Sequence, residues 1–148
     1  QNAGYNLKID VPKPINNPWR PDPSWNNTYK SFLSDKIYGG MSSALTDGTA
    51  ASLGIKLRKY SAYTFYAKTG TISSADGTEK GDNSKRLAIL ITKGGESAAS
   101  QSGKFYVVYF RFDKARKEGM GDGDFWTLCD EIIGKIVSSS SFKNYMGE

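Results

Sequence analysis

The chain has no histidine and a single cysteine, Cys129. One cysteine cannot form an intramolecular disulfide or a cysteine-rich zinc site, and the absence of histidine removes the commonest metal ligand and general base. We therefore expect neither a metal site nor a cofactor. Any catalysis must use Ser, Thr, Lys, Tyr or carboxylate side chains. Cys129 falls on the apolar face of a predicted helix, which predicts a buried, inert thiol.

Long hydrophobic runs are also absent, and the first ten residues lack the charged and apolar regions of a signal peptide. We expect a soluble chain, and its start at Gln1 suggests a processed or trimmed product. The 20 basic and 15 acidic residues give a net charge of +5. This excess is mild and spread along the chain, so it does not indicate a nucleic-acid partner.

Proline is missing after residue 23. Because proline removes a backbone donor and favours extended geometry, residues 1–27 are predicted to be a proline-rich extended arm. Its apolar residues Val11, Ile15 and Trp19 suggest that the arm packs on a surface. Residues 28–148 are long enough for one domain with its own core. The five prolines are Pro12, Pro14, Pro18, Pro21 and Pro23.

Hydrophobic periodicity in the domain predicts an α+β fold. An apolar stripe after Thr28, which Asn27 or Thr28 could cap, predicts two helices that break at Gly39-Gly40 and end at Gly48. Three segments rich in aromatic and β-branched residues then predict strands in a small antiparallel sheet, in sequential order. A helix over 124–137, capped by Asp122 or Asp124, should cover one face of the sheet. The predicted strands are 60–72, 85–92 and 104–112.

Three short motifs precede or lie in the first predicted strand: Gly40-Met41, Gly48-Thr49-Ala50 and Lys68-Thr69-Gly70-Thr71. In this order and at these separations, the chain resembles the C-terminal half of the penicillin-binding transpeptidases over about residues 28–137. In that family a serine attacks an acyl donor and forms an ester, and a Lys-Thr-Gly strand forms one wall of the cleft. The plainer alternative is that Lys68 is an ordinary strand lysine.

The resemblance implies a role for each residue of the strand motif. Lys68 would supply positive charge, and Thr69 a hydroxyl, for the substrate carboxylate. Gly70 would let the substrate lie close to the strand, and the backbone N–H of Thr71 would donate to the oxyanion hole. The implied ligands are a peptidoglycan stem peptide or a β-lactam, and the implied location is the periplasm or cell envelope of a bacterium.

The family also uses Ser-x-x-Lys and Ser-x-Asn, both well before Lys-Thr-Gly. Ser140-Ser-Phe-Lys143 matches the first pattern, but it follows the triplet and is predicted to be a frayed helix end. Ser24-Trp25-Asn26 matches the second but is only about forty residues before Lys68, so a turn or helix cap is expected there. We therefore expect the nucleophile half to be absent and this chain alone to be inactive. It would be either a fragment or a degenerate relative.

Two other interpretations remain open from the sequence. Docking of the absent half, or of another copy of the chain in a homo-oligomer, would cover an apolar surface beside the first helices. A non-catalytic glycan- or peptide-binding module could instead use exposed aromatic side chains near Lys68. The candidate aromatic residues are Tyr63, Tyr66, Tyr106 and Tyr109.

Overall fold

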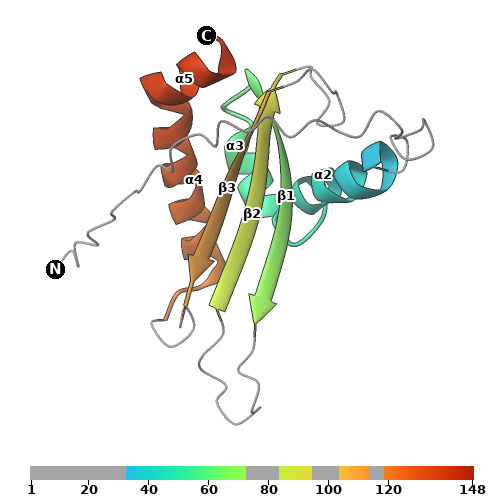
Figure 1. The fold of residues 1–148 in the computed structure, drawn as a ribbon. Coiled ribbons are helices and arrows are strands. Elements are labelled where there is room, and N and C mark those ends of the chain that lie inside the picture. Colours follow the sequence, from blue (N-terminus) through green and yellow to red (C-terminus); the bar gives the residue numbers. More distant parts are fainter. Residues whose placement is uncertain (1–32, 73–83, 95–103, 114–118) are drawn as a thin grey trace, which may run out of the picture.

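The computed structural model describes residues 33–72, 84–94, 104–113 and 119–148. The predicted arm and the cap at Asn27 or Thr28 lie outside these residues. Within them, three strands form one antiparallel sheet in the order β1-β2-β3, so the predicted α+β class and strand order are confirmed (Figure 1). The strands are β1 (Tyr63–Ile72), β2 (Ser84–Lys93) and β3 (Phe105–Phe112).

The first helical region is continuous where a break was predicted. A π-helical turn, η1 (Leu33–Tyr38), passes directly into α2 (Gly39–Thr46), because Tyr38 keeps right-handed helical dihedral angles. The predicted division into two helical elements is therefore found at Gly39, but as a change from π-helix to α-helix and not as an interruption of the helical backbone. The predicted end at Gly48 is confirmed, since its N–H donates to the Ser43 carbonyl at 2.9 Å.

A short helix, α3 (Ala51–Leu57), follows and was not predicted. It has only two buried residues, Leu53 and Leu57, so its apolar spacing gives little signal. The turn before α3 is made by backbone bonds, with Ala50 N–H donating to the Ala44 carbonyl at 2.9 Å. These bonds hold α3 against α2.

The predicted last helix is confirmed as α4 (Asp122–Ser138). Its N-cap is Gly121, however, and not Asp122 or Asp124. Asp124 acts from the third helical position, where its carboxylate accepts the Gly121 N–H at 3.0 Å. A further helix, α5 (Ser140–Met146), corrects the predicted frayed end, because the Ser139 hydroxyl caps it by accepting the Phe142 N–H at 3.2 Å.

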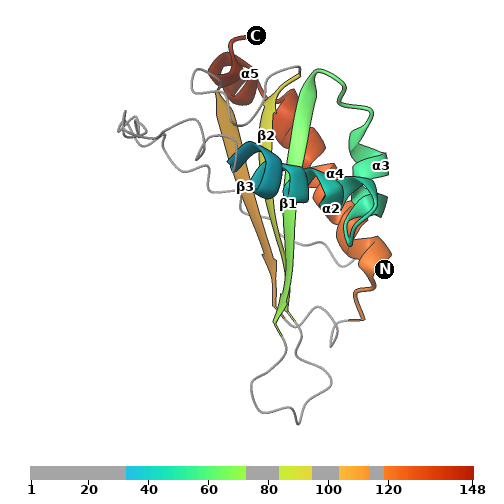
Figure 2. The same cartoon turned by 90° about the vertical axis from the view of Figure 1, so that its right-hand side faces the viewer.

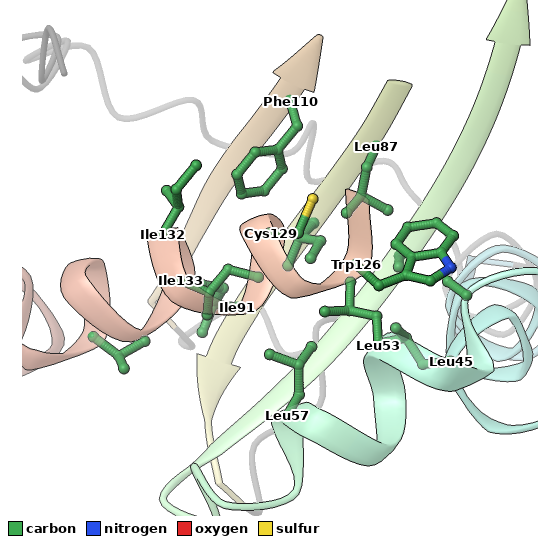
Figure 3. Close-up of a cluster of buried hydrophobic side chains, with 14 of the residues drawn as sticks. Leu45, Leu53, Leu57, Leu87, Ile91, Phe110, Trp126, Cys129, Ile132 and Ile133 are labelled. Atoms are coloured by element: carbon green, nitrogen blue, oxygen red, sulfur yellow. The ribbon is translucent and has the colours of Figure 1, made fainter. Parts of the chain in front are cut away.

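The helices α3 and α4 lie on one face of the sheet, which we call the inner face (Figure 2). Strand alternation turns Ala67, Leu87 and Ile89 to this face, where all three are fully buried. On β1, Lys68 follows Ala67 and Gly70 comes two residues later. Both therefore lie on the opposite face, which we call the outer face. Figure 3 shows Leu53 of α3 and the α4 side chains meeting the sheet in one core.

Among the residues that the structure describes, no helix is long and apolar enough to span a membrane.

Candidate functional site

Strand β1 is an edge strand of the described sheet. The η1–α2 helix packs against it: the Tyr38 ring meets Tyr66 of the outer face at 5.7 Å between centroids, and Leu45 enters the core on the inner side. The helix therefore crosses the edge of β1. The motif Lys68-Thr69-Gly70-Thr71 lies further along the strand, toward its end.

Lys68 is exposed on the outer face of β1. Its Nζ donates to the carbonyl of Thr69 at 2.6 Å. No carboxylate pairs with it among the described residues, so its charge is not used in a structural ion pair. Because the Lys68 ammonium bonds to a neutral carbonyl of its own strand, its positive charge can still attract an anion that approaches the edge of β1.

Thr69 lies on the opposite side of the strand from Lys68. Its Oγ1 is 2.7 Å from Oγ1 of Thr49, and the two hydroxyls share a hydrogen bond. Thr49 belongs to the Gly48-Thr49-Ala50 motif, so the fold brings together two motifs that are twenty residues apart. This bond ties the turn before α3 to the strand and fixes the Thr69 side chain at the rim of the sheet.

Replacing Thr49 and Thr69 by valine, singly and together, is expected to reveal a coupling of about 0.5 to 1 kcal/mol in unfolding free energy. The magnitude is modest because the hydrogen bond is exposed and water can replace it. Urea unfolding of the four proteins measures the coupling. Strictly additive single changes would mean that the two hydroxyls do not interact in solution.

Arg86, which the sequence did not single out, lies beside the motif on the outer face. It pairs in register with Gly70 on β1 and with Arg111 on β3. Like charges directly opposite each other destabilise a sheet. Of the two arginines, Arg111 is bound by Asp113, whose Oδ1 is 2.9 Å from Arg111 Nε. The hydrogen bond from Arg111 to Asp113 raises the pKa of that guanidinium.

The Nε of Arg86 is buried and has no hydrogen-bond partner within the described part of the chain. A buried donor without a partner costs about 1–3 kcal/mol, so a ligand that supplied an acceptor would recover it. Only the strand register places Arg86 next to Gly70, which explains why sequence reasoning missed it. Lys68, Gly70 and Arg86 together form a cationic patch at the end of the sheet.

Gly70 leaves this patch open. An added Cβ would be 3.7 Å from Cβ of Arg86, an ordinary contact, so packing does not require glycine here. Its effect is to leave the strand surface bare between the two cations. Thr71 follows in β1, and only its backbone is described.

The other sequence candidates are not near this patch. Helix α5 carries Ser140 and Lys143 and packs at the opposite end of the sheet, where the Phe142 ring meets Tyr63 and Tyr106, each at 5.3 Å. Five residues of strand, about 17 Å, separate Tyr63 from Lys68. Ser24-Trp25-Asn26 lies outside the described residues.

The four tyrosines of the binding alternative do not share one surface. Tyr63 and Tyr106 face inward and pack on Phe142, and Tyr66 is covered in part by Tyr38. Tyr109 is on the outer face and 57% exposed. The arrangement does not make a continuous aromatic platform beside Lys68.

A cavity of about 300 Å³ opens between α2, α3 and the start of β1, away from the cationic patch. Its walls include Leu45, Arg58 and Phe65, but none of the Lys-Thr-Gly residues. Within the described ranges, no group of three or more potential ligand side chains could hold a metal ion. The buried Cys129 thiol, predicted to be inert, has its pKa raised by burial to about 12.

Comparison of the chain with models of protein families, with curated proteins and with solved structures found no match to any of them.

Proposed function

We propose that this chain is the carboxylate-binding wall of a serine D,D-transpeptidase of the penicillin-binding type, the C-terminal portion of an enzyme that cross-links peptidoglycan. The observation that carries the proposal is the patch formed by Lys68, Gly70 and Arg86 at the end of an edge strand. Two cations flank a residue without a side chain, and neither is in an ion pair within the described residues.

The chemistry follows from this geometry. A terminal carboxylate would bind Lys68 and Arg86, whose guanidinium can donate two parallel hydrogen bonds. An extended peptide held there would lie along the end of β1 that follows the α2 crossing and pair with its backbone. Its scissile carbonyl would then accept from the backbone N–H of Thr71, a donor that the strand holds in place before reaction.

The Thr69 hydroxyl would act from the rim of the strand, where Thr49 holds it. The serine nucleophile and its lysine would come from a part of the protein that is not in this chain. The same site would bind a β-lactam, because its carboxylate and carbonyl imitate those of the acyl donor. Such an enzyme would act outside the bacterial cytoplasm.

Titration of the chain with N-acetyl-D-alanyl-D-alanine should shift the amide resonances of Lys68–Thr71 and Arg86 in heteronuclear NMR spectra. Lys68→Ala should weaken this binding about 10- to 100-fold, because a hydrogen bond to a charged group contributes about 1.5–3 kcal/mol. Lys93→Ala is the matched control. Lys93 is an exposed lysine on β2, where it pairs with Tyr63 at the end of the sheet away from Lys68. The dipeptide with a C-terminal amide tests the need for a carboxylate.

Shifts that are the same for the acid and the amide, or that persist in Lys68→Ala, would contradict the proposal. A fluorescent penicillin should leave no covalent label on this chain after denaturing electrophoresis, because the nucleophile is elsewhere. A label on the chain would show that one of its own serines reacts.

A further inference from the structure

The cavity between α2, α3 and the start of β1 has no role in the proposed function. Its floor is apolar, because Leu45 and Leu57 are only 8% and 3% exposed and Phe65 packs against the same core. A small apolar hollow with a few polar groups around it is the usual form of a small-molecule site. The hydroxyl residues of the lining include Ser42, Ser61 and Thr64.

Arg58 is the one charged residue among the described residues that line this cavity. It is exposed and forms no ion pair within the described ranges, whereas its neighbour Lys59 binds Asp130 at 2.7 Å. Asp47 accepts the hydroxyl of the lining residue Thr46 at 3.0 Å, but it does not itself line the cavity. The cavity therefore presents a positive charge that no described carboxylate neutralises.

The edge of β1 that faces away from β2 adds a backbone donor. The Gly94 N–H donates to the Ala62 carbonyl at 2.6 Å, so these residues form a hydrogen-bonded pair at the start of the β1–β2 ladder. Because bonded and non-bonded pairs alternate along an antiparallel ladder, Tyr63 and Phe65 direct their N–H groups away from β2. The Tyr63 N–H does so and donates to the Tyr60 carbonyl at 3.0 Å. The Phe65 N–H has no such acceptor among the described residues.

These groups select one kind of ligand. A carboxylate accepts strong hydrogen bonds both from a guanidinium, such as that of Arg58, and from a backbone N–H. An apolar body attached to the carboxylate would cover the floor at Leu45 and Leu57, and this burial would favour binding. The volume of about 300 Å³ corresponds to roughly ten non-hydrogen atoms, at about 30 Å³ for each. A bare inorganic anion would leave the apolar floor uncovered, and a neutral apolar molecule would leave the charge unused.

We propose that this cavity binds a small monocarboxylate with an apolar body. Arg58 and the Phe65 N–H hold the carboxylate, and the body lies on Leu45 and Leu57. The site is distinct from the cationic patch, because five residues of strand, about 17 Å, separate Phe65 from Gly70. It does not depend on the transpeptidase proposal.

Phenylacetate has the size and chemistry of the proposed ligand and is the probe. Its titration into the full chain, followed by heteronuclear NMR, should give saturable shifts of the amide resonances of Leu45, Leu57, Arg58 and Phe65. The expected dissociation constant is about 1 mM, which is ordinary for a ligand of this size. Phenylacetamide has the same shape without the charge and should bind at least about 10-fold more weakly.

Arg58→Gln should weaken phenylacetate binding about 10- to 100-fold, the usual effect of losing a hydrogen bond to a charged group. Because Arg58 is exposed and unpaired within the described residues, the variant should keep its fold. Arg111→Gln is the matched control, since it removes the same charge from β3, outside the cavity. Lys68→Ala should leave phenylacetate binding unchanged, which separates this site from the proposed binding of N-acetyl-D-alanyl-D-alanine.

Several results would overturn the proposal. They are the absence of saturable shifts, equal binding of phenylacetate and phenylacetamide, and equal losses in the two arginine variants. Shifts confined to Lys68, Gly70 and Arg86, or lost in Lys68→Ala, would place phenylacetate at the cationic patch and would overturn it as well.

Discussion

Gly54→Ala is expected to destabilise the protein by at least about 3 kcal/mol, the upper end of the usual cost of overpacking. Gly54 lies in α3, where that helix crosses α2 at close range. A Cβ at this position would be 1.8 Å from the carbonyl oxygen of Leu45 and 2.8 Å from its carbon. These are backbone atoms, so no side-chain rotation relieves the overlap and the two helices would have to separate.

Separation of the two helices would also disturb the core, because Leu45 and Leu53 pack together on either side of this crossing (Figure 3). Gly40→Ala in α2 is the matched control, since nothing lies within 4 Å of a Cβ there. It should be neutral or stabilise the protein by up to about 1 kcal/mol, the helix propensity difference between glycine and alanine. Urea unfolding followed by circular dichroism measures both. Equal stabilities of the two variants would mean that the helices do not cross this closely.

Stability is expected to fall steeply between about pH 9 and pH 12, and Cys129 should account for much of the loss. Burial raises the pKa of the Cys129 thiol from 9.0 to about 12. Burial, and then a hydrogen bond to Glu148, raise the pKa of Tyr63 from 10.0 to about 12. Both groups are neutral when protonated, so the fold favours the form that carries the proton.

The direction follows from the proton balance. Between the unfolded and folded pKa values, the folded protein keeps protons that the unfolded chain has lost, so the free energy of unfolding falls as pH rises. The stabilisation is complete below about pH 9 and is lost as pH rises through the folded pKa of about 12. For Cys129 a shift of three units corresponds to about 4 kcal/mol, a large share of a typical domain stability of 5–15 kcal/mol.

Cys129→Ala isolates this contribution. The variant should lose about 1 kcal/mol at neutral pH because of the small cavity that it leaves. Above pH 9 its stability should decline much less than that of the wild type, since tyrosine and lysine titrations are common to both proteins. Urea unfolding by far-ultraviolet circular dichroism from pH 8 to pH 12 gives the two slopes. Parallel slopes would show that the thiol titrates normally in the folded protein.

The sequence by itself determined the elements that carry a strong periodic pattern. The segment 60–72 is rich in aromatic and β-branched residues, and Phe125 to Val137 repeats apolar residues at helical steps, so the strand and helix were predictable there. It also indicated that Cys129 would be buried. Local patterns specify these features because each depends on which face of one element is apolar.

Only the tertiary structure decided how these elements meet. Arg86 lies beside Gly70 because of strand register, and Thr49 reaches Thr69 because α2 and α3 fold back across the edge of β1. Helix α3 is too short for its own pattern to predict it, and the contact of Gly54 with Leu45 depends on how two helices cross. Such contacts join residues far apart in the chain, and no local propensity determines their distances. The physical reason is that periodicity depends only on which face of one element is apolar. The distances between elements depend on how all the apolar faces are buried together.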